Sequence, residues 1–110
     1  IGWLQAQFQK LWTTPNILTE VDNLGRQLPM NEWNGFSHAL RTLCLRMYEE
    51  SVVSTVAMAN KSFSRLGLSD NVTLSLGGSF LLISDDLALC NEAGRLGFDA
   101  LNFNHIRLSQ

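Results

Sequence analysis

The stretch LLISDD, residues 81–86, runs from apolar side chains into two adjacent carboxylates. Together with Phe80 it begins with FLLI, a continuous apolar run typical of a strand buried in a parallel sheet. Asp85 and Asp86 then follow the carboxyl end of that strand, which is where ligands bind in open α/β sheets. Neighbouring carboxylates repel each other, so solvent, a helix N-terminus or a metal ion has to offset the repulsion. The stretch therefore indicates an α/β fold with a polar edge after this strand.

The residues after the acid pair predict a helix and then a last strand. DDLALCNEAGRLG, residues 85–97, places Leu87 and residues 89–93 on an inner face, and Gly97 is typical of the position just past a helix end. FDALNF, residues 98–103, indicates a short strand. Strands that alternate with helices predict a parallel sheet with helical layers. In the simplest interpretation, Asp85 is only the N-cap of this helix and Asp86 an acid in its first turn.

The N-terminal half is predicted to be mainly helical. Residues 1–12, IGWLQAQFQKLW, have the apolar spacing of an amphipathic helix, and a second helix begins with Thr14 as cap and Pro15 at the first position. Glu20 lies about 80° from the centre of that helix's apolar stripe, at the rim of the expected core. Residues 31–51 predict a longer helix. The apolar stripes of these two helices consist of Ile17, Val21, Leu24 and Leu28, and of Phe36, Leu40, Leu43 and Met47.

Two central segments are less regular. Val52–Val56 is rich in β-branched residues and predicts a strand or an extended turn. NVTLSLGG, residues 71–78, alternates apolar and polar side chains, which slightly favours a strand, although Val72 and Leu76 also fit one face of a helix.

Composition indicates one soluble domain over residues 1–110, with 45% hydrophobic residues and a formal net charge of −2. The charge neither indicates nor excludes nucleic-acid binding. No apolar run approaches the roughly 18 residues of a membrane span and no signal peptide is apparent, so the default expectation is a cytoplasmic protein. Cys44 and Cys90 lie in apolar stretches and are interpreted as reduced core residues. The acids interpreted as solvated charges are Asp22, Glu49, Glu50 and Glu92, and the isolated histidines His38 and His105 are interpreted as surface or packed residues.

Acidic residues at three places are the candidates for chemistry. These are Glu20, Asp70 in GLSDN, and the pair Asp85 and Asp86. Each has an ordinary structural interpretation, since Glu20 could be a flanking helix charge and Asp70 could cap a helix that starts at Asn71. The sequence contains no arrangement of Ser, His or Cys that suggests nucleophilic catalysis, and no glycine-rich phosphate loop.

In their order along the chain, TTPNILTEVDNL (13–24), FSRLGLSDNVTLSL (63–76) and LLISDDLALCNEAGRLGFDALNFNHIR (81–107) resemble the PIN domain family. Its members are small α/β proteins, many of them magnesium- or manganese-dependent ribonucleases, including toxins of toxin–antitoxin pairs. The resemblance runs from about Trp12 to Arg107. It implies a three-layer α/β sandwich with a short parallel sheet, and it implies a helix for the segment that follows Asp70.

Carried over by position, the resemblance implies a site made of Glu20, Asp70 and Asp86, with Asp85 beside them as a further metal ligand. Ser84 matches the Ser or Thr that ends the family's fourth strand and is the expected substrate-binding residue. The implied cofactor is Mg²⁺ or Mn²⁺, which would activate water and neutralise charge on the scissile phosphate of RNA. Such ions prefer oxygen ligands, and carboxylates that would repel one another become favourable around a cation.

The sequence departs from the family pattern at its start. The family begins with a strand that ends in the leading aspartate of the site, and nothing before Trp12 resembles it. We therefore expect an N-terminally incomplete domain, with little or no catalysis by these residues alone. An unpaired sheet edge would favour a homodimer or an antitoxin-like protein partner. The alternative function is a non-catalytic PIN-derived interaction module. A receiver-like signalling domain ranks last, because no phosphoacceptor aspartate follows a second apolar strand.

Overall fold

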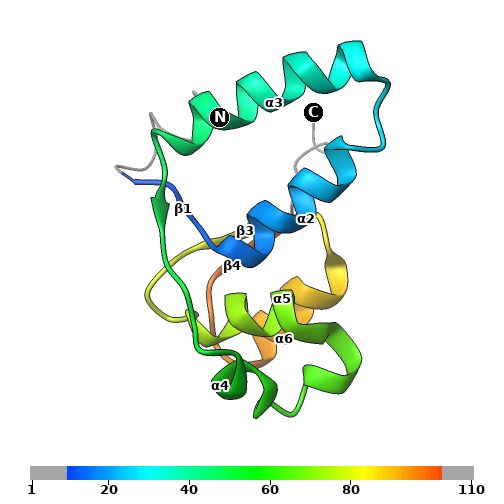
Figure 1. Ribbon diagram of the computed structural model, residues 1–110. Coiled ribbons are helices and arrows are strands. Elements are labelled where there is room, and N and C mark those ends of the chain that lie inside the picture. Colours follow the sequence, from blue (N-terminus) through cyan, green and yellow to red (C-terminus); the bar gives the residue numbers. More distant parts are fainter. Residues whose placement is uncertain (1–9, 103–110) are drawn as a thin grey trace. The chain divides into compact units, whose positions relative to one another are not determined.

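The computed structural model describes residues 10–102, which divide into two compact units between Ser51 and Val52. Each unit contains helices and one small parallel sheet, and about 57% of the described residues are helical (Figure 1). The predicted mixture of helices and parallel strands is confirmed at this level. None of the helices among residues 10–102 is both long enough and apolar enough to cross a membrane.

In the first unit, two short strands pair in parallel. β1 (Trp12–Thr13) aligns Trp12 with Tyr48 and Thr13 with Glu49 of β2 (Tyr48–Glu49). The rings of Trp12 and Tyr48 stack with their centroids 5.0 Å apart, and the Lys10 ammonium lies 5.1 Å from the Tyr48 ring centre. Cross-strand aromatic pairs and cation–π contacts both stabilise such a pairing.

Two helices connect these strands. The hydroxyl of Thr14 accepts a hydrogen bond from the Ile17 amide at 3.1 Å, and Pro15 is the first residue of α2 (Pro15–Gly25), as predicted. α3 (Met30–Cys44) follows after a short turn. Gly25 is buried, and a Cβ there would lie 2.5 Å from Cε1 of Phe36, so any larger residue would displace the Phe36 ring where the two helices meet.

The second unit contains a strand–helix–strand arrangement. β3 (Leu82–Ser84) leads into α6 (Leu87–Arg95), and the chain returns as β4 (Ala100–Asn102) in parallel with β3. The register pairs Leu82 with Ala100 and Ser84 with Asn102. Gly97 has a φ of +83°, which suits glycine at the position past the helix end. The predicted strands and helix of this region are confirmed, with shorter strands than expected.

The apolar core of the second unit is small. Leu74, Leu89 and Ala93 are buried, and partly buried apolar side chains pack against them. These surrounding residues are Leu66, Leu82, Phe98 and Ala100. Leu74 belongs to α5 (Phe63–Ser75), so the core joins α5 to the strand–helix–strand arrangement.

Hydrogen bonds between buried polar side chains shape the start of this unit, where α4 (Ser54–Met58) precedes α5. Gly67 interrupts α5 with φ +86° and ψ −178°, and the helix restarts after it. Asn71 is fully buried, and its amide nitrogen donates to the Gly67 carbonyl at 2.7 Å. The Ser62 hydroxyl donates to the Asn71 amide oxygen at 2.6 Å. This pair of bonds fixes the kink.

Several predictions in the N-terminal part are wrong. Trp12 lies in a strand and not in a helix, while the rest of the helix expected over residues 1–12 falls almost entirely outside the described residues. The long helix expected over 31–51 ends at Cys44, because the chain turns there to pair β2 with β1. Glu20 is exposed and does not lie at the rim of a core.

In the second unit, the strand or turn predicted over Val52–Val56 is wrong, because residues 54–58 form α4. The segment after Asp70 is helical. The family resemblance implied this helix, whereas the alternating pattern of the segment slightly favoured a strand. Leu87, expected on the inner face of α6, is 56% exposed. Cys44 and Cys90 are free and half-buried.

Candidate functional site

Three of the candidate site residues lie at the carboxyl edge of the β3–β4 pair. Ser84 ends β3 opposite Asn102, and Asp85 and Asp86 follow it with exposed side chains. The Ser84 hydroxyl accepts a hydrogen bond from the Asp86 amide at 3.1 Å. Ser84, Asp85 and Asp86 therefore lie together in one short turn, whose backbone Ser84 holds.

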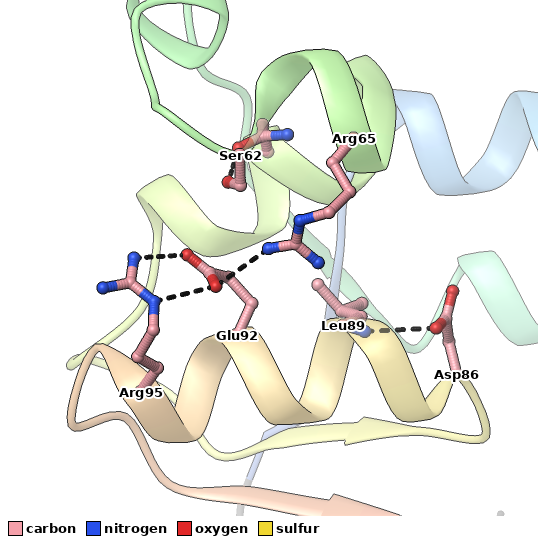
Figure 2. Close-up of polar contacts among 7 residues, drawn as sticks. Ser62, Arg65, Asp86, Leu89, Glu92 and Arg95 are labelled. Atoms are coloured by element: carbon pink, nitrogen blue, oxygen red, sulfur yellow. Dashed lines mark hydrogen bonds and ion pairs between the residues drawn. The ribbon is translucent and has the colours of Figure 1, made fainter.

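Asp86 is the N-cap of α6, and this corrects the expectation that Asp85 would cap the helix. Asp86 Oδ1 accepts a hydrogen bond from the Leu89 amide at 3.1 Å (Figure 2). A carboxylate at this place is favoured by the unpaired amides and the dipole of the helix N-terminus. The helix thus offsets part of the repulsion between the neighbouring acids. Oδ2 of Asp86 accepts no hydrogen bond within residues 10–102.

Cys90 lies one helical turn into α6, with its sulfur 3.8 Å from the Ser84 carbonyl oxygen. Burial raises the pKa of the Cys90 thiol, and the negative charges of Asp86 and Asp85 raise it further. The thiol consequently stays protonated near neutral pH, which argues against a nucleophilic or thiolate-ligand role.

Asp70 lies in the first turn of the helical segment that restarts after Gly67, and it is half-buried. Its neighbour Asn71 anchors that turn through the bonds to Ser62 and Gly67. Asp70 therefore lies inside α5 and does not cap a helix that starts at Asn71, while its position near the start of the restarted helical segment agrees with the turn that the resemblance implied. Asp70 and the Asp85–Asp86 pair belong to the same unit.

Glu20 belongs to the first unit, in the middle of α2. Neither unit, over the described residues, gathers three His, Cys, Asp or Glu side chains that could hold a metal ion together. The structure thus brings Ser84, Asp85 and Asp86 together in one turn, and it places Asp70 on α5 of the same unit. The inclusion of Glu20 in one site with them stays a prediction.

Glu92 is the charged residue that sequence reasoning missed, since it is not a solvated charge. Only 6% of its side chain is exposed, and Figure 2 shows it between Arg65 of α5 and Arg95 of α6. Arg65 Nη2 lies 3.0 Å from Glu92 Oε1, while Arg95 reaches Oε1 through Nε at 2.9 Å and Oε2 through Nη2 at 2.6 Å. The only signal in the sequence was the spacing of Glu92 and Arg95, which permits a pair on one helix.

This ion-pair cluster predicts a pH dependence of stability. The hydrogen bond from Arg95, followed by the charges of both arginines, holds the pKa of Glu92 below its ordinary value of 4.5. A group with a lowered folded-state pKa stabilises the fold above its unfolded-state pKa, and the contribution is lost as the pH falls through the folded value. Glu92→Gln should therefore lower the melting temperature at pH 7, and its deficit relative to the wild type should shrink below pH 4.5.

Thermal melts of both proteins between pH 3 and pH 7 measure this difference. Asp99→Asn is the matched control, because Asp99 is an exposed acid of the same unit that makes no ion pair within residues 10–102. A Glu92→Gln deficit that stays constant over this pH range would contradict the assignment.

No family model matches the chain, and neither the curated proteins nor the solved structures gave a match.

Proposed function

We propose that the second unit carries part of a metal-dependent ribonuclease site of the PIN type, with Asp70 and Asp86 as its acids and Asp85 beside them. The observation that carries the proposal is the turn after β3, where Ser84, Asp85 and Asp86 stand at the carboxyl edge of a parallel strand pair. Ligand sites of α/β proteins lie at this edge. The proposal includes a PIN-like three-layer sandwich as the fold that holds this site.

The donor atoms fit Mg²⁺ or Mn²⁺, which take carboxylate oxygens and keep several waters, so one or two acids suffice. Such an ion supplies an activated water and neutralises charge on the phosphate. Asp86 would use Oδ2 for the ion, because Oδ1 holds the Leu89 amide. Ser84 orients the Asp86 backbone through its oxygen, which leaves its hydroxyl hydrogen to donate to a phosphate oxygen of RNA.

Two substitutions of Asp86 distinguish its proposed role in metal binding from its role as the N-cap of α6. Asparagine caps helices as well as aspartate, so Asp86→Asn should keep the stability of the metal-free protein and lose the response to Mn²⁺. Asp86→Ala should lose that response and also cost about 0.5–2 kcal/mol of stability. With a millimolar dissociation constant, 10 mM Mn²⁺ should stabilise the wild type by about 1.4 kcal/mol. Thermal melts with and without Mn²⁺ measure both effects.

Asp70→Asn should likewise abolish the rise in melting temperature with Mn²⁺, whereas Asp99→Asn should keep it. In an assay with labelled RNA, cleavage that depends on Mn²⁺ should disappear in Asp86→Asn. Equal Mn²⁺ shifts in the wild type and all these variants would show that the acids are not a metal site.

Equal Mn²⁺ shifts in all these proteins would favour a second candidate function, that of a non-catalytic interaction module. It is suggested by large apolar side chains that stand exposed around the helices of the first unit. Leu45 is 84% exposed, Met30 is 73% exposed and Leu24 is 64% exposed. Exposed apolar groups of this kind are typical of surfaces that bind a protein, such as a second copy of the chain or an antitoxin-like partner.

A further inference from the structure

The buried carboxylate of Glu92 holds the side chains of Arg65 and Arg95 at the protein surface. Their side chains are 56% and 62% exposed, whereas Glu92 between them is only 6% exposed. The buried acid therefore fixes two guanidinium groups next to each other without covering them. Figure 2 shows the two groups approaching Glu92 from opposite sides.

This cluster has more positive than negative charges, and more N–H donors than Glu92 accepts hydrogen bonds from. Two positive groups meet one negative group, and no second carboxylate lies within 4.0 Å of either guanidinium among residues 10–102. Each arginine has five N–H donors, and Glu92 uses Nη2 of Arg65 and Nε and Nη2 of Arg95. Arg65 Nε and Nη1 and Arg95 Nη1 keep their hydrogens for another acceptor.

An anion with several oxygens suits such a pair. Guanidinium groups bind phosphate through planar, charge-assisted hydrogen bonds, and here Glu92 has already ordered both side chains. Prior ordering lowers the entropic cost of binding. The chain as a whole has a net charge of −2 and would not attract nucleic acid by its overall charge. Any attraction therefore has to come from a local group of positive charges such as this pair.

We infer that Arg65 and Arg95 form a phosphate-binding site for the backbone of single-stranded RNA. The choice of RNA rests on the proposed function, whereas phosphate binding rests on the ion-pair cluster alone. The site lies toward the C-terminal end of α6, and Asp86 caps the other end of the helix. Arg95 is nine positions after Asp86 in the sequence, which corresponds to about 13.5 Å at 1.5 Å per residue. The arginines would therefore hold a phosphate away from the one that is cleaved.

Equilibrium binding of a fluorescently labelled single-stranded oligoribonucleotide to the full chain tests the site. The titrations are done in EDTA at several salt concentrations, so that the metal site plays no part. For single strands, each phosphate contact contributes about 0.7 to the slope of log K against log salt, which corresponds to about fivefold in affinity at 0.1 M salt. Arg65→Gln and Arg95→Gln should each weaken binding by about that factor and reduce the slope by about 0.7.

Arg26→Gln is the matched control, because Arg26 is also an exposed arginine in an ion pair on one helix, with Asp22 at 3.4 Å. It should change neither affinity nor slope. Arg65→Lys keeps the charge and should keep the slope, which a role confined to folding does not predict. Circular dichroism confirms that each variant is folded at the temperature of the titration.

Equal RNA affinities for the wild type, Arg65→Gln and Arg95→Gln would overturn the inference. Inorganic phosphate that competes with RNA for the wild type but not for the Gln variants would support it. Phosphate that stabilises the wild type while the Gln variants bind RNA unchanged would show a site for free phosphate, and would overturn the RNA assignment. A failure of the Mn²⁺ experiment with Asp86→Asn would leave these titrations unaffected.

Discussion

Leu74→Ala is expected to destabilise the second unit by about 2–5 kcal/mol, the range for removing a buried leucine from a core. Leu74 is 4% exposed and packs with Leu89 and Ala93 where α5 meets α6. The core of this unit is small, so few neighbouring side chains can move to fill the cavity. A loss of this size is a large part of the total stability of a small domain, and the unit should be partly unfolded at 37 °C.

Amide hydrogen exchange of the full chain, resolved to peptides from residues 54–102, measures this loss. Leu87→Ala is the matched control, because Leu87 also lies on a helix of this unit but is 56% exposed. It should change the stability by no more than about 0.5 kcal/mol. Equal effects of the two substitutions would mean that the core is not centred on Leu74.

Asn71→Leu is expected to cost about 1–3 kcal/mol, although the two side chains have the same number and branching of heavy atoms. The substitution removes the acceptor of the Ser62 hydroxyl and a donor to the Gly67 carbonyl. Ser62 is itself only 6% exposed, so water cannot easily replace the lost partner. The penalty comes from a buried polar group left without a hydrogen bond and not from lost packing.

A double substitution tests that reason. Replacing both partners of a buried hydrogen bond by apolar groups can be nearly neutral, so Ser62→Ala in the Asn71→Leu background should recover part of the lost stability. Asn91→Leu, at an exposed position of α6, should have little effect. Chemical unfolding followed by circular dichroism gives the four free energies. If Ser62→Ala and Asn71→Leu are simply additive, their hydrogen bond does not explain the loss.

Asp86 shows how one side chain can be compatible with two interpretations. Its carboxylate caps α6 through Oδ1, which accounts for the residue without any metal. The same bond leaves Oδ2 for the metal ion of the proposed site. The two roles therefore do not compete, and only a substitution that keeps the cap while removing the charge can separate them.

Local sequence signals determined the elements that depend on neighbouring residues. Thr14 followed by Pro15 set the start of α2, the apolar run before Asp85 set β3, and Gly97 marked the end of α6. These succeeded because caps, short buried strands and glycine turns are decided within a few residues. The backbone placement of Ser84, Asp85 and Asp86 at a strand end could be predicted for the same reason.

Tertiary structure decided the features that depend on residues far apart in the sequence. Glu92 looks like any solvated acid until Arg65, on another helix, is placed against it. The alternating pattern of residues 71–76 indicated a strand, but Asn71 and Leu74 are buried in a helix by contacts with Ser62 and with Leu89. Trp12 leaves its helical pattern to pair with Tyr48. Burial, ion pairing and strand pairing are set by partners that arrive from elsewhere in the chain, so the local pattern could not contain them.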